Sequence, residues 1–173
     1  MRGYRLPCRR VMATIRLAER RDAEAIRTIY NAEVATSTVT FDLVPRSLDE
    51  QIGWLDAHAG GHPAIVAELD GIVAGFGSLS PFRDRAAYGG TVEDSLYVDP
   101  AHRGQGLGRA VLRELVRLAE AHGFHTVIGR IVGGHEVSIA LHAGCGFETV
   151  GVEREVGRKF GKWLDVVVMQ RML

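Results

Sequence analysis

The sequence predicts a single α/β domain with a mostly antiparallel sheet, and three observations carry that prediction. A length of 173 residues suits one hydrophobic core. Residues 64–69 and 72–79, joined by Asp70-Gly71, have the pattern of an antiparallel hairpin. Amphipathic helical stretches alternate with such runs, and the expected order is β-α-α-β-β-β-α-β-α-β-β.

The first half of the chain begins with a weakly alternating strand at residues 13–17. Asp22 is the expected N-cap of the first helix, in which apolar residues recur at helical spacing. Residues 35–42 are rich in β-branched and hydroxyl side chains and should be irregular or extended. Ser47 and Glu50 form a capping box that opens the second helix.

The second half of the chain alternates strands and helices. A strand at residues 91–98 leads through a glycine-rich turn into a strongly amphipathic helix, which His122-Gly123 closes. The other expected elements are a strand at residues 126–132, a helix at residues 136–143, and two final strands at residues 148–156 and 164–170. No repeat or linker interrupts this order, so residues 12–173 are predicted to form one domain.

Composition and charge exclude several classes of protein. Lysine plus arginine equals aspartate plus glutamate, at 21 each, so no global basic field attracts nucleic acid. No apolar run approaches the roughly 18 residues of a membrane span. Two cysteines, Cys8 and Cys145, make no disulfide framework, and a reducing cytoplasm is the simpler location. Residues 1–11 lack the apolar core of a signal peptide and are expected to be a disordered extension or a misplaced start before Met12.

The glycine-rich turn is the strongest functional signal. Its core reads Arg103-Gly104-Gln105-Gly106-Leu107-Gly108, between an expected strand and an expected helix. Walker A loops end in Gly-Lys-Ser/Thr, and a dinucleotide fingerprint would need its third glycine at Arg109, so neither fits. The pattern R-x-x-G-x-G remains. Glycines and the free N–H groups of a helix start favour a bound phosphate over an ordinary turn.

Glu93 is the candidate general base. On a strand, Glu93 and Tyr97 share one face while Asp94 and Val98 share the other. Glu93 precedes Val98 by five residues, roughly 16 Å at about 3.3 Å per residue. A molecule anchored at the glycine loop could therefore place a reactive group near this carboxylate, which could accept a proton. The alternative is a solvated glutamate on an edge strand.

A metal centre is not expected. His135-Glu136 begins the pattern H-E-x-x-H, but Ile139 stands where the second histidine would be. His135 and His142 are seven residues apart, about 10.5 Å along a helix, too far for one ion.

The whole pattern resembles the GNAT acyltransferases, and within them the phosphinothricin and methionine sulfoximine N-acetyltransferases. The resemblance runs from about Thr14 to Leu173. The segments that carry it, besides the glycine loop, are Thr36–Phe41, Thr91–Val98, Ser138–His142, Gly144–Phe147 and Lys159–Asp165. It implies a GNAT fold with helices flanking a mixed sheet, acetyl-CoA as co-substrate and a homodimer.

The resemblance also implies roles for individual residues. The glycine loop would bind the pyrophosphate of coenzyme A, and backbone N–H groups of the Leu96, Tyr97 and Val98 strand would hold the oxyanion. Glu93 would be the base, and His142 would assist proton transfer or orient substrate, with a packing role equally open. His135 stands where relatives carry an asparagine that contacts the pantetheine arm.

Substrate contacts are expected from three loops. Their candidate residues are Thr38, Phe41, Arg83, Arg85, Tyr88 and Phe160. An amino-acid substrate needs a cation for its carboxylate, which Arg83 or Arg85 could supply, although either arginine could simply be solvated. Phe160 and Trp163 could equally be core or dimer aromatics. The leaving thiolate lacks an obvious acid, because Phe147 stands where many family members have tyrosine.

The sequence thus predicts an acetyl-CoA-dependent N-acetyltransferase that acts on a small amino-acid-like amine by direct transfer in a ternary complex. Relatives acting on methionine sulfoximine carry an arginine near Gly89, and its absence here leaves the exact amine open. Two alternatives stay open, a protein or peptide N-acetyltransferase and a non-catalytic acyl-CoA-binding module. No nucleic acid and no membrane partner is expected.

Overall fold

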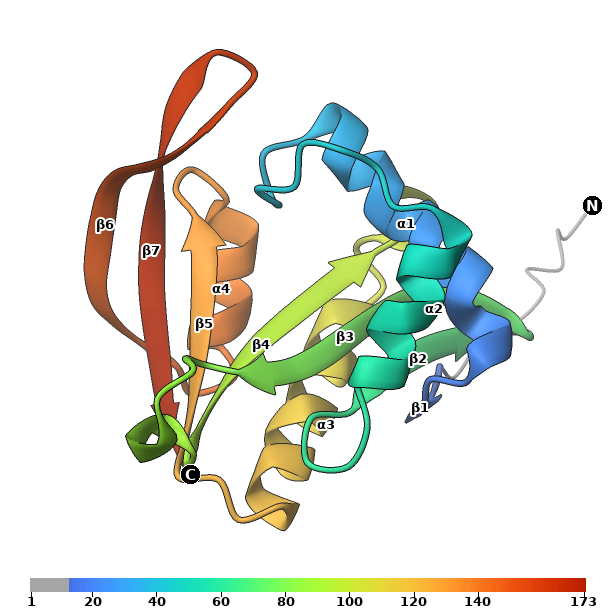
Figure 1. Cartoon of the computed structure of the whole chain (residues 1–173), viewed down its shortest axis with the longest axis horizontal. Coiled ribbons are helices and arrows are strands. Elements are labelled where there is room, and N and C mark those ends of the chain that lie inside the picture. The colour runs from blue at the N-terminus through green and yellow to red at the C-terminus, as the bar shows by residue number, and fades with distance from the viewer. Residues whose placement is uncertain (1–12) are drawn as a thin grey trace, which may run out of the picture.

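A twisted seven-stranded sheet forms the centre of the computed structural model, which describes residues 13–173 (Figure 1). Its strand order is β1-β2-β3-β4-β5-β7-β6, and among these strands only β4 and β5 pair in parallel. The predicted mostly antiparallel sheet is therefore confirmed. The strands are β1 (Thr14–Leu17), β2 (Ala64–Leu69), β3 (Ile72–Pro81), β4 (Thr91–Val98), β5 (Thr126–Val132), β6 (Glu148–Lys159) and β7 (Lys162–Met172). The expected extension at residues 1–11, with Cys8, lies outside the described residues.

Four α-helices and three short 3-10 turns connect the described strands. The α-helices are α1 (Ala23–Thr36), α2 (Leu48–Ala57), α3 (Leu107–Ala121) and α4 (Glu136–Ala143). The 3-10 turns are η1 (Arg20–Asp22), η2 (Ala86–Tyr88) and η3 (Pro100–His102). Within residues 13–173, no helix combines the length and the apolar character needed to cross a membrane.

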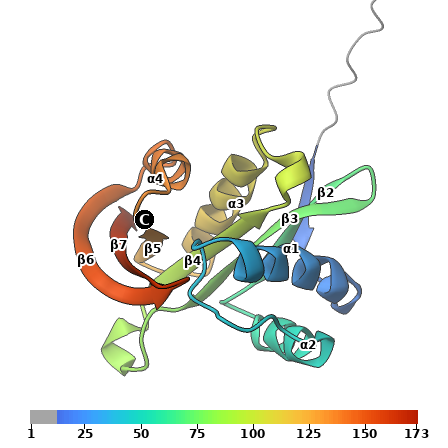
Figure 2. The ribbon, with the colours of Figure 1, turned by 90° about the horizontal axis from the view of Figure 1, so that it is seen from above.

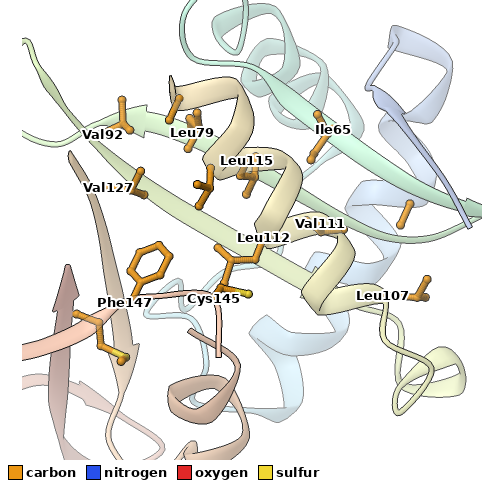
Figure 3. Packing of buried hydrophobic residues seen from close by; sticks show 14 of the residues in the cluster. Ile65, Leu79, Val92, Leu107, Val111, Leu112, Leu115, Val127, Cys145 and Phe147 are labelled. Carbon is orange, nitrogen blue, oxygen red and sulfur yellow. The ribbon is translucent and has the colours of Figure 1, made fainter. Parts of the chain in front are cut away.

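The helices lie in two layers. In Figure 2, α3 and α4 cover one face of the sheet, while α1 and α2 cover the other. The apolar stripe of α3, which includes Val111, Leu112 and Leu115, packs on the sheet and buries these side chains completely (Figure 3). Phe76 and Tyr30 belong to the second core, beneath α1 and α2. Because α1 packs on β3 and β4 and α2 packs mainly on α1, their side of the sheet is left without a helix over β5, β7 and β6.

The first helix begins as predicted, but Asp22 works differently from a simple N-cap. Its side chain makes no hydrogen bond to the first turn of α1. Instead, its carboxylate accepts two bonds from the Arg16 guanidinium, at 2.7 and 2.8 Å, and one from the Glu19 N–H at 2.8 Å. A buried carboxylate next to a long cation is better satisfied by a bidentate pair, so Asp22 fastens β1 to the helix start.

The two final strands are longer than predicted. The strand β6 continues to Lys159 and β7 begins at Lys162, so only Phe160 and Gly161 form the turn. Both turn residues have positive φ, 50° and 76°, as a tight type I′ hairpin requires. The predicted break after Val156 is instead an irregularity of register within the pairing of β6 with β7. The turn of this long hairpin therefore projects beyond the end of β5, toward the loop between α1 and α2 (Figure 1).

Candidate active site

The main cavity lies where β4 and β5 diverge. Their parallel pairing runs from Thr91 opposite Thr126 to Asp94 opposite Gly129 and stops there. Beyond that point, residues 95–98 of β4 and 130–132 of β5 line a cavity of about 1030 Å³. The glycine loop and residues of α4 complete its wall. The divergence leaves the edge of β4 that faces β5 without a strand partner inside the cavity.

The glycine loop presents backbone donors to this cavity. Gly104 and Gly106 have φ of 76° and 84°, a region that residues with a side chain enter only with strain. Within residues 13–173, the N–H groups of residues 104–109 bond to no acceptor, and Ala110 is the first to bond back, to the Gly106 carbonyl at 3.1 Å. Free donors at the start of a 15-residue helix form an anion site.

Arg103 holds the loop in place. Its Nη2 donates to the carboxylate of Glu33, which is buried in α1, and its Nε donates to the Val98 carbonyl at 3.2 Å. The guanidinium therefore ties the loop to β4 and α1. The backbone N–H groups are the larger set of unsatisfied donors available to a phosphate, and among the described residues Arg103 Nη1 also bonds to no acceptor.

Glu93 lies on the open face of the sheet, as its position on the strand predicts. It pairs in register with Ser80 of β3 and Ile128 of β5. Desolvation of its half-buried carboxyl is the largest effect on the pKa of Glu93 and raises it. The charge of Arg130 lowers this pKa, and the charges of Asp94 and Glu153 raise it. The balance raises the pKa of Glu93 above the usual glutamate value. A carboxylate with a raised pKa is better matched to accepting a proton from an amine.

His142 and Asp94 form a buried pair on the opposite face of β4. His142 Nε2 lies 3.1 Å from Asp94 Oδ2, and both side chains are at most 4% exposed. Gly129 makes room for them, because a Cβ there would lie 2.9 Å from His142 Cδ2 and 3.2 Å from Asp94 Oδ1. Both members of the pair also line the cavity.

The hydrogen bonds of this pair require a shared proton. His142 Nδ1 lies 2.8 Å from the Ser138 carbonyl, which can only accept, so Nδ1 carries a hydrogen. The contact between Nε2 and Asp94 then needs a second proton, on either group. Burial opposes the charged imidazole, but the bonds to Asp94 and Ser138 outweigh it and raise the pKa of His142. The pair is thus a proton store at the cavity wall.

The loop between α1 and α2 is tied to the β6–β7 hairpin. The buried Lys159 donates from Nζ to the Thr40 carbonyl at 2.9 Å. Tyr30 Oη lies 2.8 Å from Thr40 Oγ1 and donates to Asp42 at 2.6 Å. Phe41 packs on the bare backbone of Gly157, where a Cβ would fall within 2.3 Å of the ring. These contacts close the end of the open face nearest the hairpin turn.

The remaining sequence-predicted residues fall into two groups. His135 lines the cavity, and its Nε2 lies 3.1 Å from Thr38 Oγ1, which links the two candidates directly. Tyr97 also lines the cavity, and burial raises its pKa strongly, so it keeps its proton.

Most of the other candidates are exposed, although Leu107 is buried. The Arg83 guanidinium lies 5.6 Å from the Tyr88 ring on the loop between β3 and β4, which also carries Arg85. Phe160 is 57% exposed at the hairpin turn. Gln105 is exposed in the glycine loop, which Leu107 and Gly108 continue into α3. Cys145 is a buried thiol in the core, and residues 13–173 contain no cluster of His, Cys, Asp and Glu suited to a metal.

Sequence reasoning missed several residues of this site. Asp94, Glu33 and Lys159 are buried charged residues, and each bonds to a predicted site residue or its loop. Asp94 could have been noticed as a charged residue in an otherwise apolar core pattern. Its partner His142 could not be inferred, because it lies 48 residues away in the chain. Arg130 gave no signal, because a charged residue alternating on a strand usually faces solvent.

A comparison of the chain with protein families decides its identity. Residues 24–147 match the family described as "Acetyltransferase (GNAT) family". The chain belongs to the GNAT acetyltransferase family. The cavity between β4 and β5 and the adjoining glycine loop are therefore features of an acetyltransferase.

Curated relatives of this GNAT acetyltransferase cover almost all of it. Phosphinothricin N-acetyltransferase of Alcaligenes faecalis is 40% identical over 169 residues, which are 95% of this chain and 84% of that protein. The L-methionine sulfoximine/L-methionine sulfone acetyltransferase of Pseudomonas paraeruginosa is 40% identical over 160 residues, covering 91% and 93% of the two chains.

Solved structures confirm the predicted GNAT fold. An acetyltransferase of Salmonella typhimurium with its cofactor acetyl-CoA superposes with a TM-score of 0.90 at 37% identity, covering 93% of this GNAT chain and 94% of that chain. A GNAT superfamily phosphinothricin acetyltransferase of Sinorhizobium meliloti, in complex with AcCoA, gives 0.87 at 41% identity, covering 93% and 88%.

Proposed function

We propose that this GNAT enzyme transfers the acetyl group of acetyl-CoA to the amine of a small amino-acid-like substrate of the phosphinothricin or methionine sulfoximine type. The observation that carries the proposal is the arrangement along β4. Glu93 lies near one end of this strand on the open face, the glycine loop follows the other end, and the cavity runs between them. The activities for which the relatives are named support the substrate class.

The residues present fit acetyl-CoA. The unbonded N–H groups of residues 104–109 suit a pyrophosphate, and the unpaired edge of β4 at residues 95–98 suits the amides of the pantetheine arm. When bound, acetyl-CoA supplies the acetyl group as an activated thioester. His135 and Leu96 line the same cavity and would contact the arm.

Each functional group has a place in direct transfer. Glu93 accepts the proton of the acceptor amine, directly or through water. Backbone N–H groups of residues 96–98 stabilise the negative charge that develops on the carbonyl oxygen, and losing one such donor typically costs ~10²–10³ in rate. His142 shares a proton with Asp94, and the departing thiolate can take this proton from the imidazole. Cys145 takes no part because it packs in the core and does not line the cavity.

The decisive experiment measures release of coenzyme A with a panel of acceptors. L-Methionine sulfoximine, L-methionine sulfone, phosphinothricin, the standard amino acids and a set of short peptides would each be offered with acetyl-CoA. We expect turnover with free amino-acid-like amines. Preference for peptides, or calorimetric binding of acetyl-CoA without turnover on any amine, would overturn the proposal.

The glycine loop provides a test of donor binding. We expect Gly106→Ala to raise the KM for acetyl-CoA about tenfold or more, because alanine is strained at a φ of 84° and the loop N–H groups would turn away from the anion. The KM for the acceptor should change little. Initial rates at varied acetyl-CoA check this, with Gly60→Ala, in a distant turn, as the matched control. Equal effects in both variants would contradict it.

We infer a homodimer formed through the β6–β7 hairpin, in the cytoplasm. β6 is a long edge strand, and Val150, Val152 and Trp163 are each more than half exposed on the hairpin. A long apolar edge normally needs protection from uncontrolled pairing, and a second copy would provide it. Light scattering after size exclusion should give twice the chain mass, and Val152→Lys should reduce it to one chain. If the wild type has the mass of a single chain, the proposed dimer is wrong.

A further inference from the structure

Arg130 is placed beside the proposed base by the register of the sheet. Ile128 of β5 pairs with Glu93 of β4, and Arg130 lies two residues further along β5, on the same face. Although the two strands diverge from this point, the long Arg130 side chain is close enough for its charge to act on Glu93. Arg130 also lines the main cavity, whereas Arg83 and Arg85 do not. It is the cation that acts on the charge of Glu93.

The guanidinium of Arg130 is only partly used by the protein. Its Nη2 pairs with Glu153 of β6, and both side chains are 37% exposed. Within residues 13–173, its Nε and Nη1 donate no hydrogen bond. By contrast, all three nitrogens of Arg16 are bonded to acceptors. Arg130 therefore keeps an accessible set of donors on a face that no helix covers.

Opposite charges on neighbouring strands match the charges of an α-amino acid. Such a molecule carries an ammonium group and a carboxylate on one carbon atom, so a site for it needs an anion and a cation close together. Glu93 would receive the amine, and Arg130 would receive the carboxylate in a bidentate pair made by Nη2, through the hydrogen that Glu153 does not use, together with Nε or Nη1. Glu153 keeps the guanidinium in place before the substrate arrives.

We propose that Arg130 binds the carboxylate of the acceptor and so restricts this enzyme to acceptors with an acid group beside the amine. This inference rests on the proposed N-acetyltransferase function. In this proposal Arg130, and not the exposed loop arginines Arg83 and Arg85, is the cation that binds the substrate. Arg130 is a specificity residue, and Glu153 is the residue that positions it.

The test compares an acid with its uncharged analogue. L-Methionine sulfone and its carboxamide would be acetylated by the wild type, Arg130→Met and Arg130→Lys, with Arg113→Met on the exposed side of α3 as the matched control. For Arg130→Met, we expect the KM of the acid to rise about 10- to 100-fold, because a charge-assisted pair is lost. The KM of the carboxamide should change less than about twofold, and lysine should restore part of the loss.

Other results would overturn the proposal in distinguishable ways. Equal losses for the acid and the carboxamide, with the acid limb of the pH profile displaced, would show that Arg130 acts only through Glu93. Unchanged kinetics would show that it only holds β6. If the wild type acetylates neither compound, the proposed activity on them fails, and calorimetry of the acid with the CoA-loaded protein decides about Arg130. If the wild type binds the acid and Arg130→Met does not, the proposal is supported. If both proteins bind it equally, or if neither binds it, the proposal is overturned.

Discussion

Replacing Glu93 by glutamine should lower kcat/KM for the acceptor by about 10²–10⁴-fold, the usual contribution of a positioned general base. Glutamine keeps the size of the side chain but cannot accept the proton of the amine. The KM for acetyl-CoA should stay close to that of the wild type, because the glycine loop lies beyond the other end of β4. Unchanged turnover would remove Glu93 from the mechanism.

The pH dependence gives this prediction a second readout. Burial raises the pKa of Glu93, and only the deprotonated form can act as a base. Activity of the wild type should therefore fall on acidification at a higher pH than an ordinary glutamate would give. The residual activity of Glu93→Gln should lack this acid limb. Profiles of kcat/KM for both proteins, with Glu24→Gln on the surface of α1 as control, check the sign.

Glu93 should also destabilise the folded protein at neutral pH. A carboxyl whose pKa is raised by folding binds its proton more tightly in the folded state, so its contribution falls as the pH rises through that raised pKa. Glu93→Gln should therefore be more stable than the wild type at neutral pH, with the difference disappearing in acid. Thermal unfolding measured at several pH values tests this. A variant that is both inactive and less stable at neutral pH would indicate a structural role instead.

Replacing Asp94 by alanine should destabilise the protein by about 3–5 kcal/mol, because it leaves His142 buried without its partner. For a chain of this size, each kcal/mol corresponds to roughly 2–4 °C in Tm, so the expected loss is large. Asp94→Asn is the matched control. Its amide can donate to Nε2 of a neutral imidazole while Nδ1 still donates to the Ser138 carbonyl, so the loss should be much smaller.

The two Asp94 variants should differ in their pH dependence as well. The pKa of His142 is raised in the folded protein, so the stabilisation from the charged pair is complete below about pH 6.5 and is lost as the pH rises through the raised value. The advantage of the wild type over Asp94→Asn should therefore shrink as the pH rises. Chemical unfolding between pH 5.5 and pH 9 measures it, and an advantage independent of pH would mean that the proton is not shared as described.

Sequence reasoning predicted most of the fold and the position of the glycine loop before α3. The glycine loop, the capping box at Ser47 and the amphipathic helix after Gly106 are local signals, each determined by a few neighbouring residues. The long β6–β7 hairpin was predicted too short, because Gly157 looks like a break when its packing partner is unknown. That partner is Phe41, more than a hundred residues earlier in the chain.

The acceptor end of the site was much harder to predict. The loop arginines Arg83 and Arg85 were reasonable cations for a substrate, yet Arg130 lies closer in register to the base. The importance of Arg130 depends on which strand lies beside β4, and that neighbour is set by the crossover through α3. Likewise, His142 was identified as a candidate, but its buried carboxylate partner was not.

The amino-acid sequence alone therefore determined the fold class, the family and the place of the glycine loop, because these depend on periodicity and on residues close together in the chain. Only the tertiary structure decided which charged groups meet. The pairs of Asp94 with His142 and of Arg103 with Glu33 join residues 48 and 70 positions apart. Charge pairing depends on distances of a few ångströms between distant segments, and strand order and register set those distances after the chain has folded.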